Sequence, residues 1–159
     1  MGKLENPIQS AILSFLAYRP NSWVIPLSAK KKERPKRELI LNQLADAPTG
    51  IVWWRSNSGA HKTGRSFVRY GCSGQPDIMG LHKPTGMLLG IEVKAGAGSL
   101  EPSQEFWQSM AGFVGVPYVV ARSVDDVSTW LARLDTNLDK ITQLRHEVDP
   151  WTTTKQTPK

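Results

Sequence analysis

The chain has 159 residues and a mass of 17.7 kDa, the size of one compact domain, which excludes a multidomain machine. Twenty Lys and Arg against fourteen Asp and Glu give a net charge of +6, and 40% hydrophobic residues exclude a disordered basic tail. One cysteine, Cys72, excludes an intrachain disulfide and favours a reducing cytoplasm, and no apolar run is long enough for a membrane span.

The first predicted element is an amphipathic helix, because five apolar residues follow helical spacing: Ile8, Ala11, Ile12, Phe15 and Leu16. We expect this helix to end before Arg19-Pro20, because a residue that precedes proline disfavours the helical conformation. Residues 21–37 contain two prolines around a basic run and predict a loop, followed by a short helix over 38–45. Residues 26–48 therefore have the character of a basic insertion.

Strands dominate the middle of the chain. Residues 51–56 and 65–70 predict two of them, with turns at 57–59 and 71–74. The apolar runs 77–82 and 87–94 are joined by Lys83-Pro84-Thr85-Gly86, a suitable four-residue hairpin loop. We expect these two runs to form a central hairpin.

A helix is predicted after Pro102, with a buried stripe that ends at Gly115 and contains Phe106, Met110, Phe113 and Val114. Residues 118–121 predict a short strand, and Ser123 with Asp126 predicts a capping box before the last helix, which carries Val127 to Leu134. The order of elements predicts a single α/β domain with a mixed sheet over residues 1–135. Residues 136–159 are a C-terminal extension, and we expect its tail from Asp149 to be flexible.

The acidic residues of the middle third indicate chemistry. Between Ala47 and Leu100 the only acids are Asp77 and Glu92, although the first hundred residues hold the basic excess. If the hairpin loop is 83–86, Asp77 falls directly opposite Glu92, with Cβ atoms about 4.5–5.5 Å apart. Because side chains alternate along a strand, Lys94 shares the face of Glu92. Two carboxylates at this spacing suit Mg²⁺ or Mn²⁺, and Lys94 can hold a metal-bound water or a phosphate.

A structural interpretation competes with this one. Glu92-Val93-Lys94 can be an ordinary exposed strand face, and Asp77 a turn residue after Pro76. The functional interpretation is favoured by the combination of features, since an isolated acidic pair is aligned on otherwise hydrophobic strands, where charge is least expected.

Pro76-Asp77 followed by Glu92-Val93-Lys94 resembles the signature of PD-(D/E)xK nucleases. The wider series of 74–78, 90–94, Gln104 and 118–123 is similar to the virus-type replication-repair nuclease (VRR-NUC) family, over about residues 4–134. The resemblance implies a restriction-endonuclease-like core and metal-dependent hydrolysis of DNA phosphodiesters. Asp77, Glu92 and the Val93 carbonyl would be metal ligands, and Lys94 would orient water or stabilise charge.

The resemblance also implies roles for Glu5 and Gln104. Glu5 and Gln9 match the opening Glu-x-x-x-Gln of the family, in which the Glu completes the metal site. Pro7 is compatible with a helix that starts near Lys3 or Leu4, whereas a start at Asn6 would leave Glu5 outside it. Gln104 would anchor Lys94 or the scissile phosphate, and its alternative is a solvated residue of the first helical turn.

Basic and polar residues outside this set are candidate DNA contacts: Arg55, Asn57, Lys62 and Arg65 around a turn, and Lys30, Lys31 and Lys32 in the insertion. A plain hairpin turn and a solvated surface run are the alternatives. Trp53 and Trp54 lie on opposite faces of a strand, so at most one faces DNA. The three histidines and Cys72 lack the spacing of zinc ligands, so we expect no zinc site.

Size and resemblance together predict a small Mg²⁺- or Mn²⁺-dependent DNA endonuclease that acts on branched DNA, like a Holliday-junction resolvase. Such an enzyme is expected to be a homodimer, because two nicks on a branched duplex need two active sites. A phage or mobile-element origin, and thus a host cytoplasm, would suit it. The alternatives are a flap, nicking or restriction-like endonuclease with the same site, and a DNA-binding protein whose carboxylates are structural.

Overall fold

The computed structural model describes residues 5–26, 34–56, 59–63, 66–83 and 85–148. Within these ranges the chain forms helices and strands in the following order: α1 (Glu5–Tyr18), β1 (Ser22–Val24), α2 (Arg34–Asp46), β2 (Gly50–Arg55), β3 (Gly59–Thr63), β4 (Ser66–Tyr70), β5 (Ile78–Lys83), β6 (Met87–Val93), α3 (Pro102–Val114), β7 (Tyr118–Ala121) and α4 (Val124–Val148). None of the helices in the described ranges has the length and apolar character needed to cross a membrane.

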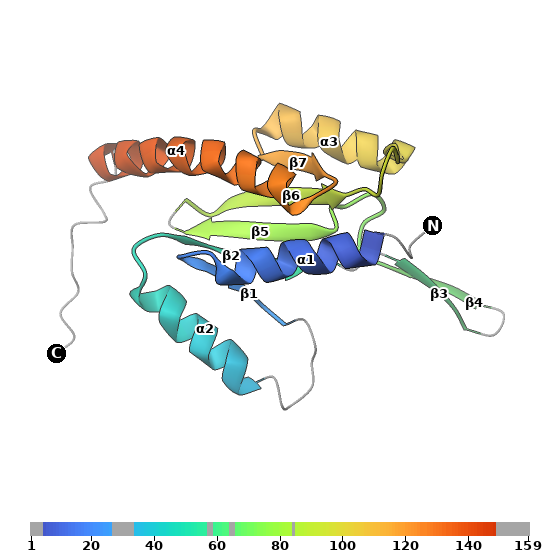
Figure 1. The fold of residues 1–159 in the computed structure, drawn as a ribbon, viewed down its shortest axis with the longest axis horizontal. Helices are drawn as coiled ribbons and strands as arrows, with labels where there is room; N and C mark the ends of the chain where they lie inside the picture. Colours follow the sequence, from blue (N-terminus) through green and yellow to red (C-terminus); the bar gives the residue numbers. More distant parts are fainter. Residues whose placement is uncertain (1–4, 27–33, 57–58, 64–65, 84, 149–159) are drawn as a thin grey trace.

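Five strands form one mixed sheet in the order β1-β2-β5-β6-β7, and β3 pairs with β4 in a separate hairpin. The central strand β5 is antiparallel to both neighbours, whereas the edge strands β1 and β7 are parallel to theirs. The β3–β4 hairpin extends away from the sheet, at the same end of the molecule as the start of α1 (Figure 1). The predicted α/β class is confirmed, and the arrangement is consistent with a restriction-endonuclease-like core.

The hydrophobic core lies between one face of the sheet and two helices, α1 and α4, which both cross that face in Figure 1. Trp53 of β2 is fully buried, and its ring centroid is 6.5 Å from that of Trp130 in α4. Trp54 points to the opposite face and is half-buried, as strand alternation predicts. The best-buried core residues include Ile12, Leu16, Ile78, Leu89, Ile91, Val93, Val127 and Leu131.

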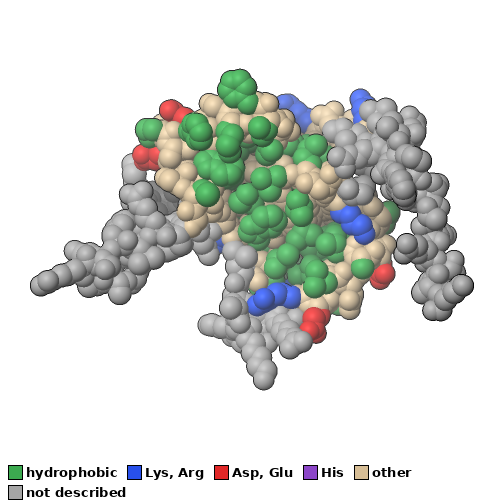
Figure 2. All heavy atoms as spheres, turned by 180° about the vertical axis from the view of Figure 1, so that it is seen from behind, with side chains coloured by type: hydrophobic (Ala, Val, Ile, Leu, Met, Phe, Trp, Pro, Cys, Tyr) green, Lys and Arg blue, Asp and Glu red, His purple; other side chains and the backbone are tan. Residues whose placement is uncertain are grey.

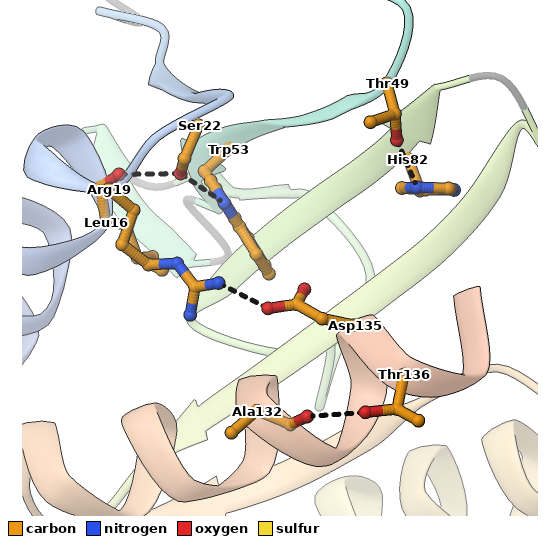
Figure 3. A network of polar contacts seen from close by, with 9 residues as sticks. All are labelled: Leu16, Arg19, Ser22, Thr49, Trp53, His82, Ala132, Asp135 and Thr136. Carbon is orange, nitrogen blue, oxygen red and sulfur yellow. Dashed lines mark hydrogen bonds and ion pairs between the residues drawn. The ribbon is translucent and has the colours of Figure 1, made fainter. Parts of the chain in front are cut away.

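A polar network closes the core at the end of the sheet where β2 begins (Figure 3). The Trp53 indole donates to Ser22 Oγ at 3.1 Å, and Ser22 Oγ donates to the Leu16 carbonyl at 2.6 Å. Arg19 pairs with Asp135 of α4 at 2.6 Å. Arg19, Ser22, Trp53 and Asp135 line a pocket of about 350 Å³, and the buried His82 lines it as well. The network ties α1, the sheet and α4 together.

The predicted buried stripe of α3 is wrong. Phe106, Phe113 and Val114 are 69%, 92% and 67% exposed, and the buried residue of this helix is Ala111. The helix itself begins at Pro102 and is closed by Gly115 with a positive φ of 74°, as predicted. The apolar spacing therefore marks a real helical stripe, but α3 buries a different side against the sheet.

The segment expected to be a loop is more ordered than predicted. Residues 22–24 form β1 beside β2, and α2 begins at Arg34 rather than at 38. Pro35 is tolerated there because it lies in the first turn, where its missing N–H forfeits no helical hydrogen bond. Lys83 Nζ anchors the other end of α2 by donating to the carbonyl oxygens of Leu44, Ala45 and Ala47 at 2.7, 3.2 and 2.8 Å.

The predicted turn at 57–59 is partly wrong, because Gly59 is the first residue of β3, a strand that the sequence does not predict. The strand predicted over 65–70 corresponds to β4, which pairs with β3. At the start of α4 the capping box is confirmed: Asp126 N–H donates to Ser123 Oγ at 3.2 Å, and Ser123 N–H donates to Asp126 Oδ2 at 3.0 Å. Hydrogen bonds from the main chain of Arg122 and from Ser123 lower the pKa of Asp126. The helix continues to Val148, and the tail from Asp149 lies outside the described residues.

Candidate active site

The central hairpin has the predicted register. His82 pairs with Met87 and Ile78 with Ile91, so the next position along the ladder places Asp77 opposite Glu92. Both residues lie at the end of the hairpin away from the loop. Glu92 is one residue beyond the core side chain of Ile91, so it points to the sheet face opposite α1 and α4.

Glu92 and Lys94 form a buried ion pair on that face. Lys94 Nζ lies 2.9 Å from Glu92 Oε1, and the two residues are 6% and 1% exposed. Removing two charges from water costs several kcal/mol per ion before their attraction is counted, and replacing such a pair by well-packed apolar residues is often neutral or stabilising. The side chains of Glu92 and Lys94 therefore meet as predicted. The stability of the sheet alone does not require charged residues at these buried positions.

Gln104 of α3 completes this arrangement. Its side-chain NH₂ donates to Glu92 Oε1 in a short hydrogen bond, while its own Oε1 accepts from the main-chain N–H of Glu101 at 2.9 Å. The second contact fixes which end of the amide faces the carboxylate, because only the NH₂ group can donate. The alternative of a solvated first-turn residue is excluded for Gln104, which contacts Glu92 rather than Lys94.

Asp77 is half-buried and is held by three elements. Its Oδ2 accepts from the N–H of Val93 at 2.9 Å, and its carbonyl accepts from Ser56 N–H at 2.8 Å and from the Gln9 side chain at 3.2 Å. Gln9 of α1 is 5% exposed. The contact of Gln9 connects the first helix to the hairpin end, at the position that the Glu-x-x-x-Gln spacing singles out.

The loop before Asp77 packs against the start of α3. Gly74 has a φ of +79°, and a Cβ atom there would lie 2.2 Å from the carbonyl oxygen of Ser103. Gln75 donates to Ser56 Oγ in a short hydrogen bond and accepts from Cys72 N–H at 3.1 Å. The loop and the first turn of α3 are thus fitted together, which sets the position of Gln104 relative to the hairpin.

Tyr118 belongs to the candidate site, although the sequence offers no reason to assign this residue a role of its own. It pairs with Gly90 across β6 and β7, on the face of Glu92, and its buried hydroxyl has no hydrogen-bond partner among the described residues. Burial raises the pKa of Tyr118, as do the charges of Glu92 and Asp77. The phenol is therefore a protonated donor close to both carboxylates. Parallel pairing brings it there, and no spacing in the sequence signals that pairing.

The loop that follows Lys94 is braced from the other side. Arg122 Nε donates to the Gly96 carbonyl at 2.8 Å, and its Nη2 donates to the Gly98 carbonyl at 2.7 Å. Lys94 N–H donates to the Ala121 carbonyl at 2.9 Å, which continues the β6–β7 ladder by one residue. These contacts hold the main chain on both sides of Lys94.

The donor set fits a hard divalent cation. Asp77 and Glu92 supply carboxylate oxygens, and the Val93 carbonyl lies between Glu92 and Lys94 in the chain. Glu5 opens α1, but its side chain is outside the described residues, so its predicted role as a ligand stays a prediction. In the part of the chain that the structure describes, no three His, Cys, Asp or Glu side chains are grouped for a metal.

The predicted DNA contacts are less well placed. Arg55 is exposed at the end of β2 and donates to the Asn6 side chain at 2.9 Å. Lys62 belongs to β3, but its side chain is not described, and Asn57, Arg65 and Lys30 to Lys32 lie outside the described residues. The structure therefore brings Asp77, Glu92, Val93, Lys94 and Gln104 together and leaves the DNA contacts as predictions.

Comparison with models of protein families, with curated proteins and with solved structures found no match.

Proposed function

We propose that the chain is a metal-dependent DNA endonuclease that hydrolyses phosphodiester bonds, with branched DNA as its substrate. The observation that supports this most is the buried Glu92–Lys94 ion pair, held by Gln104 and aligned with Asp77. Stability alone is a weak reason for an ion pair here, because apolar side chains in place of a buried pair are often neutral or stabilising. The cost is explained if the charges serve a reaction.

In this proposal Asp77, Glu92 and the Val93 carbonyl hold Mg²⁺ or Mn²⁺, with Glu5 as a further ligand. The bound cation supplies an activated water and neutralises phosphate charge. Lys94 places an ammonium beside the carboxylates, where it offsets the negative charge that develops on the phosphate. Gln104 keeps Glu92 in one orientation, and Tyr118 offers an additional donor near the same carboxylates.

DNA as the substrate is supported by charge and by shape. The basic excess lies in the first hundred residues, and the β3–β4 hairpin, which carries Lys62 and Arg69, extends from the end of the molecule where α1 begins. Basic residues next to a hydrolytic site provide affinity for phosphates without sequence preference. The preference for branched DNA follows from the resemblance to resolvases, and flap, nicking or restriction-like cutting is its alternative.

The test is cleavage of labelled four-way junction, flap and linear duplex DNA with Mg²⁺ or Mn²⁺. We expect cutting that EDTA stops and that Asp77→Asn reduces by at least about a hundredfold, while DNA binding is retained. Asn at 77 keeps an acceptor for the Val93 N–H, so the fold is preserved. Asp125→Asn, at an exposed position of α4, is the matched control and should cut normally.

Each outcome separates one interpretation from another. A wild-type protein that cuts no DNA with either metal ion would refute the enzyme and leave a DNA-binding protein with structural carboxylates. Equal cutting of duplex and junction would refute the preference for branched DNA but keep the nuclease. Normal cutting by Asp77→Asn would place the active site elsewhere.

A further inference from the structure

The hydroxyl of Tyr118 is an exception among the polar groups near the candidate site. The oxygen is buried, and it has no hydrogen-bond partner among the described residues. Most buried polar side-chain atoms in folded proteins have at least one partner, so each exception calls for a physical explanation. The Tyr118 hydroxyl therefore indicates a contact that forms in another arrangement of the side chains around it.

The position of the Tyr118 ring is set by the sheet. Tyr118 pairs with Gly90, and Glu92 is two residues further along the same strand, so all three share one face. A Cβ atom at Gly90 would lie 3.0 Å from Tyr118 Cδ2 and 2.8 Å from Pro76 Cγ. Glycine inside a strand often marks such a close approach. The ring is thus held over Gly90, beside the residue that precedes Asp77.

Two carboxylates lie near the hydroxyl. After burial, which is the largest cause, the charges of Glu92 and Asp77 raise the pKa of Tyr118. The phenol therefore keeps its proton at neutral pH and can donate it to a hydrogen bond. Lys94 and Gln104 contact Glu92 Oε1, but neither carboxylate accepts from the hydroxyl as the side chains lie here. A carboxylate has to turn before Tyr118 can donate to it.

The surroundings of the hydroxyl offer it little else. Figure 2 shows the molecule from the side opposite α1 and α4, with hydrophobic side chains over the centre and charged side chains near the margin. A buried hydroxyl without a partner lowers stability, and an apolar side chain of the same shape in its place is neutral or stabilising. Phenylalanine at position 118 would fill the same space. The hydroxyl is therefore better explained by a role in the site than by the packing of the sheet.

We propose that Tyr118 is a positioning residue of the metal site, whose hydroxyl donates to the Glu92 carboxylate when this carboxylate turns to bind Mg²⁺ or Mn²⁺. The inference rests on the metal site of the proposed function. Carboxylates that bind a metal are held in place by hydrogen bonds from neighbouring groups. Gln104 supplies one such bond from α3, and Tyr118 would supply a second from β7. Binding of the cation would thus give a partner to a buried donor.

The test is calorimetric titration of the full chain with MnCl₂, for wild type and for Tyr118→Phe. The variant keeps the ring over Gly90 and removes only the hydroxyl, so the fold is preserved. We expect Tyr118→Phe to bind Mn²⁺ at least about tenfold more weakly than wild type. In EDTA its urea midpoint should equal or exceed that of wild type, because the hydroxyl has no partner to lose. Tyr18→Phe, the same change at a residue of α1 that is 90% exposed, is the matched control and should alter neither value.

Weaker Mn²⁺ binding without a loss of stability is a result that a purely structural tyrosine would not produce. Equal Mn²⁺ affinity of Tyr118→Phe and wild type would overturn the inference and leave the proposed nuclease intact. A lower urea midpoint of Tyr118→Phe in EDTA would show that the hydroxyl has a partner without the metal, and would also overturn it.

The same titration separates this inference from the proposed function. A wild-type chain that binds no Mn²⁺ would refute the metal site and the role of Tyr118 together. A chain that binds Mn²⁺ more tightly than Tyr118→Phe but cuts no DNA would support the role of Tyr118 and refute the nuclease.

Discussion

Gln104 illustrates how one side chain determines the state of another. Its amide cannot rotate freely, because the N–H of Glu101 occupies its oxygen, and the NH₂ group is therefore committed to the buried Glu92 carboxylate. The same residue caps the helix and orients the site. A change at this position should thus affect stability and metal affinity together.

We expect Gln104→Ala to lower the free energy of unfolding by about 1–3 kcal/mol, the cost of losing a hydrogen bond to a buried charge. It should also weaken Mn²⁺ binding, since Glu92 loses its fixed orientation. Urea denaturation and calorimetric titration measure the two effects. Gln108→Ala, at an exposed position of the same helix, is the control and should change neither. Equal stability and equal Mn²⁺ affinity of Gln104→Ala and Gln108→Ala would contradict this role.

Sequence alone predicts part of the site well. The opposition of Asp77 and Glu92 depends on a loop length and on strand alternation, both of which are local, and the structure has that register. The contact of Gln104 depends on how α3 lies on the sheet, and Tyr118 depends on parallel pairing with β6. These are long-range relations, and a single sequence carries no spacing that specifies them.

At the scale of elements, the fit between Gly74 and α3 determines where that helix starts. We expect Gly74→Ala to destabilise the protein by at least about 2 kcal/mol more than Gly86→Ala, because the added methyl would overlap the Ser103 carbonyl. Gly86 also has a positive φ, of +68°, but open space around it, so Gly86→Ala measures the backbone strain alone. Thermal or urea unfolding compares them, and equal losses would show that α3 adjusts freely.

The misjudged elements have physical reasons. Helical spacing shows that Phe106 and Phe113 share a face of α3, but it does not say whether the chain's own sheet covers that face. β1 has three residues, too few for a periodic pattern, and its partner β2 is more than twenty residues away in sequence. Pro35 suggests a loop and in fact lies in the first turn of α2.

At the scale of the whole molecule, His82 makes folding depend on pH. The buried ring lies between Thr85 Oγ1 at 2.8 Å from Nδ1 and Thr49 Oγ1 at 3.2 Å from Nε2. Thr49 also donates to the Lys83 carbonyl, so it accepts from Nε2–H and Thr85 donates to Nδ1. Burial lowers the pKa of His82, and this effect exceeds the opposing influence of Asp135 and Asp139.

Because the folded state holds His82 neutral, the unfolded chain takes up a proton first as the pH falls. The contribution of His82 to the free energy of unfolding should be constant at pH values above its unfolded pKa of about 6.5. At lower pH this contribution should decrease, by at most about 1.4 kcal/mol per pH unit. Urea unfolding between pH 8 and pH 5 measures the slope. In His82→Gln this part of the slope should be absent, and an unchanged slope would assign the dependence to other groups.

The short edge strands of the sheet have a consequence for aggregation. β1 has three residues and β7 has four, so each edge offers few main-chain groups to an added strand. Edge-to-edge pairing is the usual route by which exposed sheets assemble without limit. A sheet with such short edge strands can expose apolar side chains on one face at high concentration without forming fibres. Association through a face can close after two copies, whereas association through edges continues into fibres.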